Sequence, residues 1–177
     1  ERMAREGVRA VGEIGLGSVK DPKDAAPMVK WAKEFGMTRR VLIPVDESET
    51  AQKTIQAVIA NREIVPREIF LLHVVDVHLV HRLVPDIQRN MVHEAAKKSG
   101  KRILEKLAKP FQDAGFEPEL LLELGTPGIE ILKVVEKQNI QLVIIGRHPG
   151  SGGFRDIMFG SVAKEVVHAV KCPVLLF

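Results

Sequence analysis

The sequence has no tyrosine, one tryptophan and one cysteine. A single cysteine cannot form an internal disulfide and suits a reducing compartment, so we expect a cytoplasmic protein. No apolar run reaches the roughly 18 residues that a membrane-spanning helix needs, so no membrane partner is expected. Because aromatic residues make up only 5% of the chain, valine, isoleucine and leucine must fill the core. A core of this composition favours a buried parallel sheet.

A strong charge of one sign is also missing. The formal net charge is +3, and the charged residues, 28% of the chain, are spread along it. The basic pairs Arg39-Arg40 and Lys97-Lys98 are short and typical of solvated surfaces, so nucleic acid is not an expected partner. A chain of 177 residues that is 45% hydrophobic is predicted to form one globular domain.

The two best-known phosphate-binding loops are absent, because the chain has no Gly-Lys-Ser/Thr and no G-x-G-x-x-G after a strand. What is present is an apolar run, 142–145, that stops at Gly146 and leads through a glycine-rich stretch to Gly160-Ser161. Glycines let a backbone approach a ligand closely, and a helix start favours an anion. This stretch predicts a phosphate site, with Ser161 as helix N-cap and hydroxyl donor. A flexible surface loop is the alternative interpretation.

From about residue 40 onward, apolar runs alternate with helical patterns. Strands are predicted over 40–46, 68–75, 117–124, 141–146 and 174–177, and helices over 47–61, 87–115, the residues after Pro127, and 161–170. Alternation of this kind predicts a parallel sheet with helices on both faces and right-handed crossovers.

Local signals refine the helices. Ser48 or Thr50 is expected to cap the first helix, and Thr126, followed by Pro127, is expected to cap the third. The long helix is expected to break near Gly100, and Pro110 is expected to end or kink it.

Several histidines and the cysteine are candidates for chemistry. His73 lies within an apolar strand and is interpreted as a neutral core residue. His78 and His81 are spaced to meet on one turn, but no cysteine pair or acidic cluster completes a metal site there. His168 is expected near a helix C-terminus, and Cys172 is interpreted as a small buried residue rather than a redox centre.

The position of a ligand pocket follows from the predicted sheet. In open parallel sheets, ligands lie at the carboxyl ends of the strands, where the strand order reverses. Two strand ends stand out in composition, namely Pro44-Val45-Asp46 and Gly146 onward. We therefore expect these two strands to be neighbours, with the pocket between their ends.

Residues 1–36 are predicted to form an N-terminal extension to a domain at 37–177. Residues 8–16 alternate as a strand does, and 25–35 have the pattern of an amphipathic helix. The stretches 7–36 and 115–140 both run glycine, strand, glutamate, glycine-containing turn and helix. This echo is either chance or the remnant of a second copy, in which case tandem copies become an option.

Three stretches, in order, resemble the universal stress protein family. They are VLIPVDES from residue 41, LLHVVD from residue 71, and the segment 146–177, in which Gly-Ser opens a helix and Cys-Pro-Val-Leu follows it. The resemblance covers 37–177. It implies a Rossmann-like α/β fold, an open five-stranded parallel sheet of order 3-2-1-4-5.

The resemblance also implies an adenine-nucleotide site. Pro44 and Asp46 would lie beside the ribose and adenine, the backbone of Val74 would meet the adenine edge, and Gly160 with Ser161 would hold phosphate. The full implied set is Pro44, Val45, Asp46, Val74, Gly146, Arg147, His148, Gly150, Gly160, Ser161 and Val162. The family's nine-residue gap before Gly160-Ser161 is kept, but three residues separate Gly146 from Gly150 where nucleotide-binding members have two.

Three functions remain open at this point. The first is a binding module that signals by ATP or AMP occupancy and forms a homodimer through 174–177. The second is a nucleotide-free dimerisation module, which the one-residue insertion supports. The third is a slow ATP-hydrolysing enzyme in which Asp46 holds Mg²⁺ through the nucleotide and His148 meets a phosphate. No positioned base and nucleophile support efficient catalysis.

Overall fold

The computed structural model describes residues 40–62, 68–77, 85–146 and 160–176. Within them, strands and helices alternate along the chain as the sequence predicted. The elements are β1 (Arg40–Pro44), α3 (Glu49–Ala60), β2 (Glu68–Val75), α5 (Asp86–Asp113), β3 (Glu119–Leu124), α6 (Pro127–Lys137), β4 (Leu142–Ile145), α7 (Ser161–Ala169) and β5 (Val174–Leu176). The predicted extension 1–36 and the histidines His78 and His81 lie outside the described residues.

The five strands form one parallel sheet in the order β3-β2-β1-β4-β5. β1 lies at the centre, paired with β2 on one side and β4 on the other. The order implied by the family resemblance is therefore confirmed, and so is the expectation that the first and fourth strands are neighbours. Between them the chain changes its direction of progress across the sheet, which is where such folds bind ligands.

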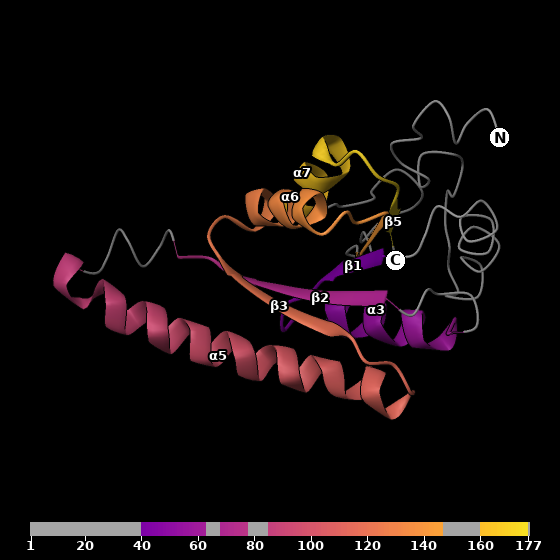
Figure 1. The fold of residues 1–177 in the computed structure, drawn as a ribbon, viewed down its shortest axis with the longest axis horizontal. Coiled ribbons are helices and arrows are strands. Elements are labelled where there is room, and N and C mark those ends of the chain that lie inside the picture. Colours follow the sequence, from indigo (N-terminus) through magenta and orange to yellow (C-terminus); the bar gives the residue numbers. More distant parts are fainter. Residues whose placement is uncertain (1–39, 63–67, 78–84, 147–159, 177) are drawn as a thin grey trace, which may run out of the picture.

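The helices cover both faces of the sheet. Figure 1 shows α3 and α5 on one face and α6 and α7 on the other. Successive side chains of a strand point to opposite faces, so Val41 and Ile43 join the α3/α5 core while Leu42 joins the α6/α7 core. All three are completely buried. This double burial explains why the strands read as continuous apolar runs rather than as alternating patterns.

Helix α5 runs unbroken for 28 residues, so the expected break near Gly100 is wrong. A Cβ at Gly100 would lie 2.5 Å from Leu122 Cδ1 and 3.1 Å from Val75 Cγ2. The glycine therefore lets α5 lie close against β2 and β3. Here the residue serves helix-to-sheet packing and does not interrupt the helix.

Pro110 likewise does not end α5, which continues to Asp113. A proline removes one helical hydrogen bond, but the next residue anchors the turn. Phe111 is completely buried and packs edge-to-face on Phe116, with ring centroids 6.0 Å apart at 82°. Burial of this ring stabilises the turn that contains the proline.

The helix caps agree with the sequence at two sites and differ at a third. Ser48 caps α3, its Oγ accepting from the Ala51 amide at 3.1 Å, and Thr126 is the N-cap of α6. The prediction of Ser161 as N-cap is wrong, because Gly160 takes that place in α7. The Gly160 carbonyl accepts the first helical bond, from Lys164 at 3.0 Å, and Ser161 is already helical.

No helix in the described part of the chain combines the length and apolarity needed to cross a bilayer. Strand β3 begins at Glu119, two residues later than predicted.

Candidate functional site

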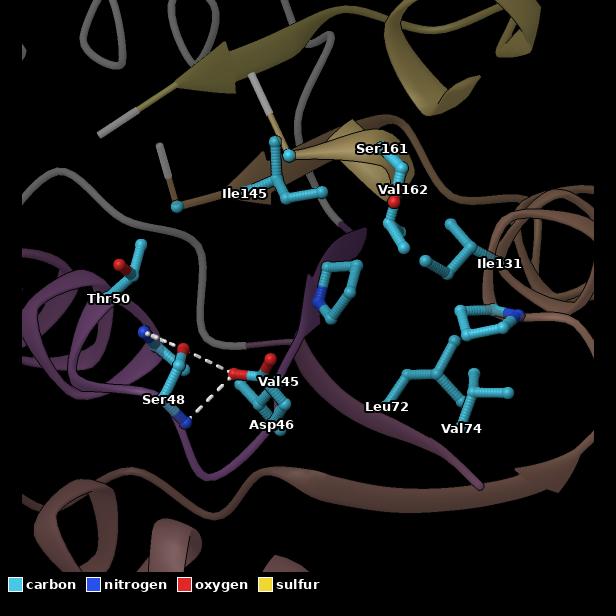
Figure 2. Close-up of a pocket in the computed structure, with 15 residues that line it drawn as sticks. Val45, Asp46, Ser48, Thr50, Leu72, Val74, Ile131, Ile145, Ser161 and Val162 are labelled. Carbon is cyan, nitrogen blue, oxygen red and sulfur yellow. Dashed lines mark hydrogen bonds between the residues drawn. The ribbon is translucent and has the colours of Figure 1, made fainter. Parts of the chain in front are cut away.

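A cavity of about 380 Å³ opens at the carboxyl edge of the sheet, between the ends of β1 and β4. It lies at the predicted position. Its walls come from the ends of three strands and the starts of three helices (Figure 2). The lining residues are Pro44, Val45, Asp46, Ser48, Thr50, Ala51, Leu72, Val74, Pro127, Ile131, Ile145, Gly146, Gly160, Ser161 and Val162.

The structure brings together every predicted site residue that it describes. Those residues are Pro44, Val45, Asp46, Val74, Gly146, Gly160, Ser161 and Val162. Arg147, His148 and Gly150 lie outside the described residues. Sequence reasoning missed the lining contributions of Ser48, Thr50, Ala51, Leu72, Pro127, Ile131 and Ile145. The ends of apolar strands and the helix starts were visible in the sequence, but the inward face of α6 follows only from tertiary packing.

One wall of the cavity is apolar. Leu72 and Val74 alternate onto the α6 side of β2, and Ile131 reaches them from α6 (Figure 2). Ile131 is 1% exposed and Leu72 is completely buried, so these side chains are fixed by the core below them. A rigid aliphatic wall of this kind suits the flat face of a heterocyclic ring.

Asp46 is tied to the start of α3. Its Oδ1 accepts from the Ser48 amide at 3.1 Å and from the Ser48 hydroxyl, whose oxygen in turn accepts from Ala51 N (Figure 2). These bonds hold the exposed carboxylate at the cavity edge. A carboxylate has about four acceptor positions on two oxygens, so capacity remains for hydroxyls of a ligand.

Val45, the residue before Asp46, is held through both of its backbone polar groups. Val45 N donates to the Leu72 carbonyl at 2.8 Å, and the Val45 carbonyl lies 2.9 Å from His73 Nδ1. Because a carbonyl oxygen only accepts, Nδ1 is the donor in this hydrogen bond. His73 is thus half-buried in β2 and hydrogen-bonded to backbone. Across the residues that the structure describes, no three metal-ligating side chains gather into a group.

The starts of α6 and α7 both border the cavity and differ in charge. Glu130 lies in the first turn of α6, and the carboxylate of Glu165, a residue of α7 beyond its first turn, lies against Gly128 in the first turn of α6. The first turn of α7 has no acidic residue, and its N-cap Gly160 has no side chain with which to cap the helix. Since carboxylates already compensate the positive end of α6, the start of α7 is the place that favours an external anion.

Among the described lining residues, Asp46 is the one with an ionisable side chain. The single cysteine lies elsewhere, in the core between the sheet and α6/α7. Burial raises the pKa of the Cys172 thiol to about 11, so the thiol stays protonated at neutral pH. The prediction of a small buried cysteine is confirmed.

The fold and site together define an open parallel α/β sheet with a cavity at its switch point. A model of the universal stress protein family matches residues 37–177, and the chain belongs to that family. Universal stress protein MJ0577 of Methanocaldococcus jannaschii is 27% identical over 155 residues, covering 79% of this chain and 94% of that protein. Universal stress protein YxiE of Bacillus subtilis is 26% identical over 147 residues, covering 79% and 99%.

Solved structures agree. The structure of MJ0577 superposes with a TM-score of 0.66 at 27% identity, covering 78% of this chain and 95% of that one. A universal stress protein from Archaeoglobus fulgidus, solved in complex with dAMP, has a TM-score of 0.54 at 19% identity, covering 79% and 98%. The second likeness shows the shared fold. The family resemblance and the fold class predicted from the sequence are both confirmed.

Proposed function

We propose that this cavity binds an adenine nucleotide, ATP or AMP, and that its occupancy signals in a stress response. The observation that carries the proposal is the polarity of the cavity. An apolar wall of Leu72, Val74 and Ile131 faces a helix start, at Gly160 and Ser161, that lacks acidic residues. A nucleotide has the matching asymmetry, with a flat base at one end and phosphates at the other.

The placement of the ligand follows from these two ends. The base would lie against Pro44, Val74 and Ile131, with the Asp46 carboxylate accepting from ribose hydroxyls. The phosphates would meet the backbone of Gly160, Ser161 and Val162, and Ser161 is an exposed residue that lines the cavity there. We further propose that Gly146, Arg147, His148 and Gly150 border the ribose and phosphates, as the family resemblance implies.

A magnesium ion fits this arrangement through Asp46. Mg²⁺ is commonly held by one or two carboxylates together with substrate phosphates. Asp46 supplies one carboxylate, and its bonds to Ser48 fix that group at the cavity edge. Asp46 would hold the cation jointly with the phosphates of a bound nucleotide, and the cation would offset their charge.

We propose binding, with at most slow hydrolysis, rather than efficient catalysis. The described lining residues offer one carboxylate, Asp46, which already accepts two hydrogen bonds from Ser48. The hydroxyl groups of Ser48, Thr50 and Ser161 have no histidine or lysine beside them among those residues. An efficient transferase or hydrolase places a base against its nucleophile.

We also propose a cytoplasmic homodimer formed through β5. The strand lies at one edge of the sheet, and the side chains of Val174 and Leu175 are buried against the core. β5 would therefore present mainly backbone donors and acceptors to a second copy. Residues 1–36 would be an extension outside this 37–177 domain. Sedimentation of the full chain tests the dimer.

The test of nucleotide binding is calorimetric titration of the full chain with ATP and with AMP, with and without Mg²⁺. Gly160→Val adds a side chain at the helix start, at a φ of −58° and ψ of 154° that valine tolerates. Ala169→Val, an exposed position at the far end of α7, is the matched control. We expect binding that Gly160→Val abolishes and Ala169→Val preserves. No heat at millimolar nucleotide would leave the nucleotide-free dimerisation module as the function.

A further inference from the structure

His73 lies directly beneath the proposed nucleotide site, on the other face of the sheet. Leu72 and Val74 point from β2 toward the cavity and α6, whereas His73, between them, points toward α5. His73 itself does not line the cavity. Its imidazole nevertheless reaches the site, because Nδ1 bonds the carbonyl of Val45 at 2.9 Å.

The bonded carbonyl belongs to the peptide that carries Asp46. β1 ends at Pro44, and the last backbone bond in this part of the described sheet runs from Val45 N to Leu72 O at 2.8 Å. Beyond that bond, the Val45 carbonyl accepts a hydrogen bond from the imidazole of His73. Because a peptide unit is planar, fixing the Val45 oxygen also fixes the Asp46 nitrogen and Cα.

Helix α5 packs against the imidazole of His73. A Cβ at Gly100 of α5 would lie 3.4 Å from His73 Cδ2, so the helix backbone lies directly against the ring. The ring thus fills the space between α5 and the Val45 peptide. In this position Nδ1 points toward the Val45 carbonyl and Cδ2 toward α5.

We infer that His73 is a positioning residue for the proposed nucleotide site: its Nδ1–H holds the Val45–Asp46 peptide so that Asp46 meets the ligand. This role rests on the proposed function. His73 touches no part of the ligand. It acts through the backbone of Val45, and Ser48 completes the alignment of Asp46 from the opposite side.

Two amide variants separate this role from mere filling of space. In His73→Asn the side-chain NH₂ takes the place of Nδ1, whereas in His73→Gln the NH₂ takes the place of Nε2. We expect His73→Asn to keep the affinity for ATP within about twofold, and His73→Gln to weaken it about tenfold, the effect of one lost hydrogen bond. Thermal unfolding of both variants reports any general loss of stability.

A spectroscopic measurement on the unsubstituted chain gives an independent readout. Nitrogen-15 NMR of the imidazole should show hydrogen on Nδ1 of His73, and the Asp46 amide should exchange faster in His73→Gln than in His73→Asn. Equal affinities of the two variants, or hydrogen on Nε2 alone, would overturn the positioning role while leaving nucleotide binding intact. Failure of the unsubstituted chain to bind ATP or AMP would instead overturn the proposed function, and this role with it.

Discussion

The end of β4 packs so closely on α3 that Gly146 has no room for a side chain beside Thr50. A Cβ at Gly146 would lie 2.4 Å from Thr50 Cγ2, 2.7 Å from Thr54 Oγ1 and 3.3 Å from the Thr50 carbonyl oxygen. Gly146 and Thr50 both line the cavity. The glycine therefore sets how near β4 comes to α3 at the edge of the proposed nucleotide site.

Replacing Gly146 by alanine should force these two elements apart. We expect Gly146→Ala to lower the free energy of unfolding by about 1–3 kcal/mol, the usual cost of overpacking a closed site. The second change Thr50→Ser, which removes the Cγ2 methyl, should recover part of that loss. Urea unfolding of the single and double variants measures both effects. Unchanged stability of Gly146→Ala would show that the two elements have room to spare.

At position 100, close packing against the sheet is expected to matter more for stability than helix propensity. Alanine would gain about 1 kcal/mol of propensity within a helix, but its Cβ would overlap Leu122 Cδ1. We expect the overlap to prevail, so that Gly100→Ala lowers the unfolding free energy by about 1 kcal/mol. Ser99→Ala, at the exposed neighbouring position, is the control and should leave stability unchanged or slightly raised. A stabilised Gly100→Ala would contradict this packing.

The caps of α3 and α6 should differ in strength. Ser48 Oγ accepts from Ala51 N at 3.1 Å, whereas the Thr126 side chain makes no capping hydrogen bond. Ser48→Ala should therefore cost about 1 kcal/mol, and Thr126→Ala clearly less. Thermal unfolding of the two variants side by side tests this order. Equal losses of stability in the two variants would mean that the hydrogen bond from Ala51 N to Ser48 Oγ does not strengthen the cap.

Cys172 should make stability depend on pH in the alkaline range. Burial raises its pKa from 9.0 to about 11, so the stabilisation is complete below pH 9 and is lost as pH rises toward 11. Relative to Cys172→Ala, the advantage of the thiol should shrink by about 1 kcal/mol between about pH 8 and about pH 10. Urea unfolding of both chains at these pH values measures the difference. If the unfolding free energies of the two chains changed with pH in parallel, the pKa of the thiol would not be raised in the folded state.

Much of the fold was readable from the sequence because the strands are buried on both faces. Val41 to Ile43 and Leu142 to Ile145 are continuous apolar runs, and each is bounded by helical patterns. Alternation then fixes a parallel sheet, and the family resemblance supplies the order of the strands. The first and fourth strand ends meet as predicted.

The failures are places where tertiary contacts override a local signal. Gly100 was expected to break α5 and Pro110 to end or kink it, but α5 continues through both to Asp113, with Gly100 lying close against β2 and β3 and Phe111 buried in the core. The start of α7 is set by the backbone of Gly160, although Ser161 has the better capping side chain. Ile131 is one apolar residue among several in its helix, and only the packing of α6 on the sheet makes it part of the cavity wall.

The most direct test of the central claim is the nucleotide content of the purified chain. The protein would be denatured and its supernatant separated by ion-pair chromatography, with Gly160→Val prepared in parallel. We predict that ATP or AMP is released from the unsubstituted chain and is absent from the variant, because the proposal places the phosphates at the start of α7. No released nucleotide, together with no calorimetric response to millimolar ATP or AMP, would contradict the account.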